Sequence, residues 1–130
     1  MTEPTKGLLD TSVVIDHDLI DAVLLPDESA ISASTLAELA DGPHATQDTD
    51  ERARRQDRLQ WAISTWDPLP FDAEAARAYG RMFAAAGQSS RARLADLLIA
   101  STAAANSLPV YTRNPSDFDA LKSIIKIVHI

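Results

Sequence analysis

Short apolar runs alternate along this chain with longer stretches whose apolar residues recur at helical spacing. The apolar runs are typical of buried strands, and they fall at 7–10, 30–33, 67–71 (very short), 108–112 and 124–130. Helical spacing, with capping and breaking residues at its ends, predicts helices over 35–40, 46–66, 72–86 and 94–106, and a loop or short helix over 11–18. This alternation predicts an α/β fold in which helices cover both faces of a parallel sheet.

The length and composition are those of one small domain. The 130 residues fit a single domain over 1–130, and the lack of cysteine excludes disulfides and Cys-ligated metal sites. The amino terminus has no signal-peptide pattern, and the longest nearly apolar segment, 94–105, is too short to cross a bilayer. We therefore expect a soluble protein that does not contact membranes and resides in the reducing cytoplasm.

The net charge of −7 is unevenly distributed along the chain. Residues 1–50 carry eleven acids and one base, whereas residues 51–130 carry eight acids and eleven bases. An acidic total argues against passive nucleic-acid binding through a broad basic face. An acidic net charge is compatible with a nuclease in which metal ions and a few arginines contact the phosphates. The acidity therefore indicates either solubility alone or a local cluster that attracts divalent cations.

Four acidic residues lie in four separate, mostly apolar stretches: Asp10, Glu38, Asp96 and Asp117. A buried carboxylate is costly unless it is paired or binds a cation. Each of the four lies at the carboxyl end of a predicted strand or in the helix or turn beyond it, where ligands of parallel sheets bind. We therefore expect them to share one rim as catalytic residues. Carboxylates without Cys or His favour Mg²⁺ or Mn²⁺.

Three of these acids have a structural explanation that competes with a chemical one. Asp10 and Asp117 stand where helix caps and first-turn acids are common, and Glu38 ends a Thr-x-x-Glu sequence typical of a capping box. Asp96 is the exception, because its helix is apolar nearly all round and its neighbour Arg93 offers only a weak surface pair. The case for chemistry therefore depends on the set of four.

Four motifs follow one another along nearly the whole chain: LLDTSVVID at 8–16, TLAEL at 35–39, ADLLIASTAAANSLPVYTRN at 95–114 and SDF at 116–118. Together they resemble a PIN domain, specifically a VapC-type toxin ribonuclease of a bacterial toxin–antitoxin pair. The resemblance implies a three-layer α/β/α sandwich with a mostly parallel sheet of about five strands. It also implies Mg²⁺- or Mn²⁺-dependent endonucleolytic cleavage of RNA, inhibition by a cognate VapB-like antitoxin, and a homodimer.

The resemblance also implies roles for individual residues. Asp10 and Asp96 would be direct metal ligands, and Glu38 or Asp117 would orient water or act as base. Side chains that would support the site through hydrogen bonds are Thr11, Ser12, Thr112 and Asn114. Some relatives have an acid at the position of Asn114, so in this chain the fourth acidic role would fall to Asp117 alone.

Arginines in the loops that border the predicted rim are candidates for RNA phosphate contacts, the alternative being solvated loop residues: Arg91, Arg93 and Arg113. The expected substrate is an unstacked loop of a structured RNA such as tRNA or rRNA. Two other classes remain open. A metal-dependent phosphatase-like hydrolase would need a second acid where Ser12 stands, and a non-catalytic protein- or RNA-binding α/β module would use the acids only as caps.

Overall fold

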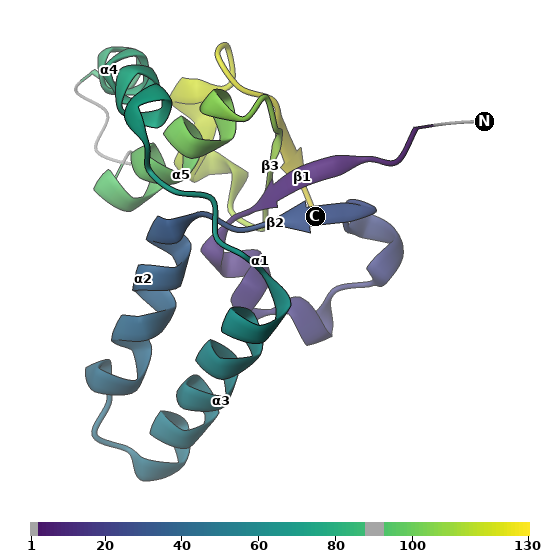
Figure 1. Cartoon of the computed structure of the whole chain (residues 1–130), viewed down its shortest axis with the longest axis vertical. Helices are drawn as coiled ribbons and strands as arrows, with labels where there is room; N and C mark the ends of the chain where they lie inside the picture. Colours follow the sequence, from purple (N-terminus) through teal and green to yellow (C-terminus); the bar gives the residue numbers. More distant parts are fainter. Residues whose placement is uncertain (1–2, 88–92) are drawn as a thin grey trace.

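The computed structural model describes residues 3–87 and 93–130, and within them a parallel sheet lies between two groups of helices (Figure 1). The strands are β1 (Lys6–Leu9), β2 (Glu28–Ala30), β3 (Val110–Thr112) and β4 (Ile127–His129). They are arranged in the order β2-β1-β3-β4, and every neighbouring pair is parallel. The α/β class and the parallel sheet predicted from the alternation of elements are confirmed.

The α-helices are α1 (Thr11–Ile15), α2 (Ala33–Asp41), α3 (Thr49–Thr65), α4 (Ala73–Ala86) and α5 (Leu94–Ala105). Short 3₁₀ helices are η1 (His17–Leu19), η2 (Ala22–Leu24), η3 (Gly42–Ala45) and η4 (Pro115–Leu121). The ends of α4 follow the predicted signals: Asp72 Oδ1 accepts a hydrogen bond from the Ala75 amide, and Gly87 terminates the helix with φ +53°. None of the helices in the described residues is long and apolar enough to span a membrane.

The two faces of the sheet have separate hydrophobic cores. Leu8 and Val110 pack with residues of α4, α5 and η4, whereas Leu9 and Tyr111 pack with residues of α1, α2 and α3. Successive residues of a strand point to opposite faces, so each short strand contributes to both cores. This arrangement produces the three α/β/α layers, and all four of these strand residues are at most 9% exposed.

The fifth expected strand, at 67–71, is reduced to a single bridge. Leu69 pairs with Ser32 in parallel, accepting from Ala33 N at 2.8 Å and donating to Ile31 O at 2.9 Å. Leu69 lies between prolines 68 and 70, which have no N–H to donate, so the ladder stops after one residue. The strand predicted at 30–33 is also displaced, to Glu28–Ala30, because Ser32 serves as the N-cap of α2.

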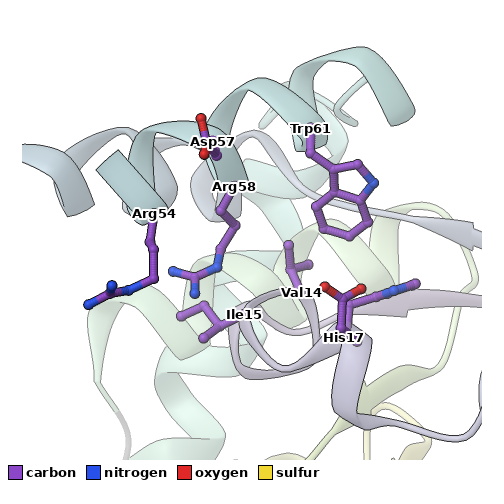
Figure 2. Close-up of a pocket in the computed structure, with 8 residues that line it drawn as sticks. Val14, Ile15, His17, Arg54, Asp57, Arg58 and Trp61 are labelled. Carbon is purple, nitrogen blue, oxygen red and sulfur yellow. The ribbon is translucent and has the colours of Figure 1, made fainter. Parts of the chain in front are cut away.

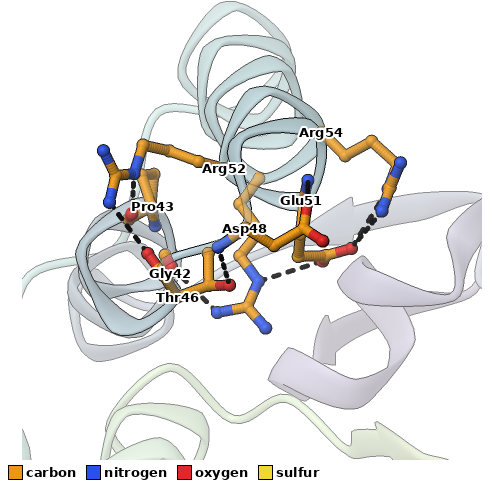
Figure 3. A network of polar contacts seen from close by, with 8 residues as sticks. Gly42, Pro43, Thr46, Asp48, Glu51, Arg52 and Arg54 are labelled. Carbon is orange, nitrogen blue, oxygen red and sulfur yellow. Dashed lines mark hydrogen bonds and ion pairs between the residues drawn. The ribbon is translucent and has the colours of Figure 1, made fainter.

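Helices α2 and α3 run side by side and project away from the sheet (Figure 1). Arginines of α3 hold the η3 turn that joins them (Figure 3). Arg52 donates from Nε to Pro43 O at 3.1 Å and from Nη2 to Thr46 O at 2.9 Å, and Arg55 Nη1 donates to Gly42 O at 2.9 Å. Two of the arginines on the polar side of this helix therefore fix the turn.

Candidate active site

Asp10 lies where β1 ends and α1 begins, at the carboxyl edge of the sheet. It occupies the N-cap position of α1, yet its side chain makes no capping hydrogen bond. Its Oδ2 accepts hydrogen bonds from Ser12 Oγ at 3.0 Å and from Thr112 Oγ1, at the end of β3, at 2.7 Å. Within the described residues no hydrogen bond reaches Oδ1. The interpretation of Asp10 as only a helix cap is therefore wrong.

Glu38 reaches the same edge from α2, and it does not belong to a capping box. The N-cap of α2 is Ser32, whose Oγ accepts a hydrogen bond from the Thr35 amide at 3.0 Å. Glu38 Oε1 instead accepts from Thr11 Oγ1 at 2.8 Å. The Thr-x-x-Glu sequence was therefore a misleading signal, and the Glu38 carboxylate faces β1 and α1 rather than its own helix end.

A chain of buried hydroxyls ends at Glu38. Ser32 Oγ donates to Thr35 Oγ1 at 3.2 Å, and Thr35 Oγ1 lies 3.0 Å from Thr11 Oγ1. Because the single proton of Thr11 goes to Glu38, Thr35 must donate to Thr11. Donors aligned in one direction reinforce one another, so the chain fixes the carboxylate. The sequence interpretation missed Ser32 and gave Thr35 only a capping role.

Burial raises the pKa of Glu38 above its ordinary value, more than the hydrogen bond from Thr11 lowers it. The charges of Asp10 and Asp96 raise this pKa further, while Arg93 lowers it. The carboxylates are therefore close enough to repel one another. Such a cluster favours either a bound proton or a bound cation.

Asp96 lies in the first turn of α5, and its side chain is only 3% exposed. Arg93 donates to it from Nε to Oδ2 at 3.2 Å and from Nη2 to Oδ1 at 3.5 Å. The pKa of Asp96 is nevertheless raised: burial is the largest cause, Arg93 lowers the pKa, and the charges of Asp117 and Asp10 add to the rise. The expected salt bridge exists, but it does not fully compensate the buried charge.

Asp117 lies in the first turn of η4, with 28% of its side chain accessible, and is more exposed than Asp10 or Asp96. Arg93 Nη2 lies 3.9 Å from its Oδ2. Asn114 stands at the N-cap of η4 without a side-chain capping bond, and its main-chain N–H donates to Thr112 Oγ1 at 2.9 Å. Thr112 thus links this turn to Asp10. The first-turn position is compatible with both interpretations of Asp117.

The four acids border one cavity of about 190 Å³ at the carboxyl edge of the sheet. Three of the predicted supporting residues, Thr11, Ser12 and Asn114, also line this cavity, and the fourth, Thr112, is hydrogen-bonded to Asp10. The residues that line the cavity are Asp10, Thr11, Ser12, Ile15, Glu38, Arg93, Asp96, Asn114 and Asp117. The structure therefore brings together all four predicted acids, and it adds Ile15, which carried no chemical signal in the sequence.

The arginines predicted to contact RNA do not gather at the cavity as the acids do. Arg93 lines the cavity but is engaged with Asp96 and Asp117. Arg113 pairs with Asp16 at 3.3 Å and lies outside the cavity lining. Arg91 lies outside the described residues.

The donor set fits a hard divalent cation in an open site. All four acidic side chains offer oxygen, which Mg²⁺ and Mn²⁺ prefer. Among the described residues, no three His, Asp or Glu side chains converge closely enough to hold an ion by themselves. Mg²⁺ typically keeps several waters and binds one or two carboxylates together with substrate phosphate. An ion at this cavity would therefore need oxygens of water or substrate to complete its coordination.

Comparison with known proteins identifies the family. The PIN domain profile matches residues 7–123. Ribonuclease VapC5 of Mycobacterium tuberculosis is 41% identical over 124 residues, which cover 92% of this chain and 90% of that protein. Ribonuclease VapC8 of the same species is 39% identical over 101 residues, covering 75% of this chain and 89% of that protein.

A solved structure agrees with this assignment. The crystal structure of VapBC-5 from M. tuberculosis, a member of the VapBC family of toxin–antitoxin systems, contains a chain with a TM-score of 0.86 and 39% sequence identity. The match covers 98% of this chain and 100% of that chain. The present chain therefore belongs to the PIN domain family, as its ordered motifs indicated.

Proposed function

We propose that this protein is a VapC-type toxin, an endoribonuclease that cleaves structured RNA such as tRNA or rRNA with Mg²⁺ or Mn²⁺ as cofactor. The observation that carries the proposal is the convergence of four carboxylates, from four distant segments, on one cavity. Support comes from 41% identity to a protein named as a ribonuclease. A capping function for the acids does not explain their shared cavity or the raised pKa values of Glu38 and Asp96.

Each acid has a role that follows from its surroundings. Asp10 and Asp96 would hold the metal, because both are buried and Asp10 keeps one oxygen free of hydrogen bonds from the described residues. When bound, the ion would polarise the scissile phosphate and favour deprotonation of water. Glu38, fixed by the hydroxyl chain and with a raised pKa, is suited to accept the proton of the attacking water. Asp117, with 28% of its side chain accessible, would orient that water.

The hydrogen-bonding residues hold these acids in place. Thr112 and Ser12 fix Asp10 through one oxygen, and Thr11 fixes Glu38. Asn114 reaches the same network through its amide and Thr112. Positioned groups of this kind accelerate a reaction because they need no reorganisation when charge develops.

The partners follow from the relatives. VapBC-5 is a toxin–antitoxin system, so we expect a cognate VapB-like antitoxin to inhibit this chain. We also expect a homodimer, a single domain over residues 1–130, and action in the cytoplasm on cellular RNA.

The direct test is to incubate the purified protein with total RNA and either Mg²⁺ or Mn²⁺ and to map new 5′ ends. We expect a small set of cuts within RNA loops, no cuts in EDTA, and suppression by a cognate VapB-like antitoxin. Asp119→Asn is a matched control, because Asp119 is 71% exposed and pairs with Lys122 on the surface. Absence of metal-dependent cuts in every RNA class would overturn the proposal.

A further inference from the structure

A second hollow adjoins the carboxylate cavity along α1 and α3. Glu38 and Ile15 line both the cavity and a neighbouring space of about 270 Å³, whose wall includes Arg58. Arg58 and Ile15 then line a further space of about 360 Å³, with Trp61 on its wall. The three spaces therefore adjoin one another at Ile15, and a strand bound at the carboxylates could leave the cavity over Ile15 toward α3.

The arginines along this path differ in how far they are already engaged. Arg93 pairs with Asp96, and Arg54 and Arg55 both bind Glu51, at 2.7 and 3.0 Å. Arg58 is half-buried and makes no hydrogen bond or ion pair with any residue in 3–87 or 93–130. A guanidinium held partly away from water without a partner favours an incoming anion.

The orientation of the side chains supports this role. Figure 2 shows Arg58 extending from α3 toward Ile15 and Val14 of α1, with Trp61 farther along the same wall. Asp57, which also borders the hollow, points away from Arg58 in this view. Trp61 offers an aromatic surface on the wall of the same hollow, and a cation combined with an aromatic side chain is a common arrangement for binding single-stranded RNA.

We propose that Arg58 binds a backbone phosphate of the RNA substrate, a few nucleotides from the cleaved bond, and guides the strand out of the carboxylate cavity past Ile15. The proposal rests on the ribonuclease function proposed above. Asp18 and Asp57 also line the hollow, so the site suits one phosphate at Arg58 rather than a long basic track. Contacts to phosphate position a substrate without reading its sequence. Arg58 therefore contributes to substrate affinity and register.

The test is the salt dependence of RNA binding. The probe is a fluorescein-labelled RNA hairpin with a randomised loop, measured by anisotropy in the Asp96→Asn background, which should bind without cutting. Adding Arg58→Gln should weaken binding severalfold at low salt. Loss of one phosphate contact should also reduce the slope of log affinity against log salt by about 0.7, the value for single strands. In the otherwise wild-type enzyme, Arg58→Gln should raise KM and leave kcat unchanged.

The matched control is Arg77→Gln, since Arg77 is 65% exposed on α4 and pairs with Glu74. It removes the same charge, so an equal loss in both variants would indicate only general electrostatics and would overturn the proposal. If the wild type cuts RNA and Arg58→Gln matches it in KM and salt slope, the phosphate site fails while the ribonuclease function stands. If Arg58→Gln weakens only the complex with the antitoxin, the hollow is a protein docking surface and the proposal is wrong. A wild type that neither binds nor cuts RNA overturns both.

Discussion

Replacing Asp96 by Asn should separate the catalytic role of this residue from its effect on stability. The carboxylate is 3% exposed, whereas its partner Arg93 is 67% exposed. A pair with so exposed a partner contributes only about 0.2–1 kcal/mol. Burying the charge costs more than that, as the raised pKa of Asp96 indicates. Without metal, Asp96→Asn should therefore increase the free energy of unfolding by about 1 kcal/mol, or raise Tm by about 4 °C.

The pH dependence follows from the direction of the pKa shift. Because burial raises the pKa of Asp96 in the folded state, its protonated form stabilises the fold below the ordinary value of 3.8. That stability is lost as the pH rises through the folded-state pKa. The higher free energy of unfolding of Asp96→Asn relative to the wild type should thus be absent below pH 3.8. It should reach its full size above the raised pKa of Asp96. Thermal unfolding in EDTA across this range measures it.

Added Mn²⁺ should reverse the order of stability. An ion at a hundred times its Kd stabilises the wild type by about 2.7 kcal/mol, and the variant should gain far less. RNA cleavage by the variant should fall by about a hundredfold or more, because a ligand to the ion is lost. Full cleavage by Asp96→Asn, or an equal rise in Tm with Mn²⁺ in both proteins, would refute the reasoning.

Two further substitutions test the supports of the site and of the sheet. Thr112→Val removes the 2.7 Å hydrogen bond to Asp10, and RNA cleavage should fall about tenfold. Thr112→Ser keeps a hydroxyl and should retain most of the wild-type cleavage activity. Equal activity of the two variants would contradict the positioning role of Thr112. Gly7→Ala would place a Cβ against the ring of Tyr111. We expect the free energy of unfolding, measured with denaturant, to fall by about 1–3 kcal/mol. An unchanged denaturation midpoint would contradict this and show that the ring moves aside without cost.

Much of this architecture could be predicted because it depends on local signals and topology. The helix over 73–86 begins and ends where Asp72 and Gly87 indicate. The convergence of the acids follows from the parallel order of the strands, since carboxyl ends of parallel strands meet at one edge. A buried helix after 94 was evident from its composition, and α5 does contribute to the core.

Other features could not be predicted, because several nearby residues could fill the same structural role and only the tertiary structure shows which one does. Ser32 rather than Thr35 caps α2, since Ser32 Oγ accepts from the Thr35 main-chain N–H, while the Thr35 hydroxyl lies 3.0 Å from that of Thr11. Leu69 forms a bridge instead of a strand because of the prolines beside it. The sequence also could not show which of the many arginines are neutralised within the protein, so it gave no reason to single out Arg58 among the arginines of α3.

The central claim is that the carboxylates form one divalent-cation site, and calorimetric titration with Mn²⁺ tests it most directly. The wild type and the surface control Asp119→Asn should both bind Mn²⁺ saturably, whereas Asp10→Asn and Asp96→Asn should each lose that binding while remaining folded. Binding by Asp10→Asn and Asp96→Asn equal to that of the wild type, or no binding by the wild type, would contradict the claim.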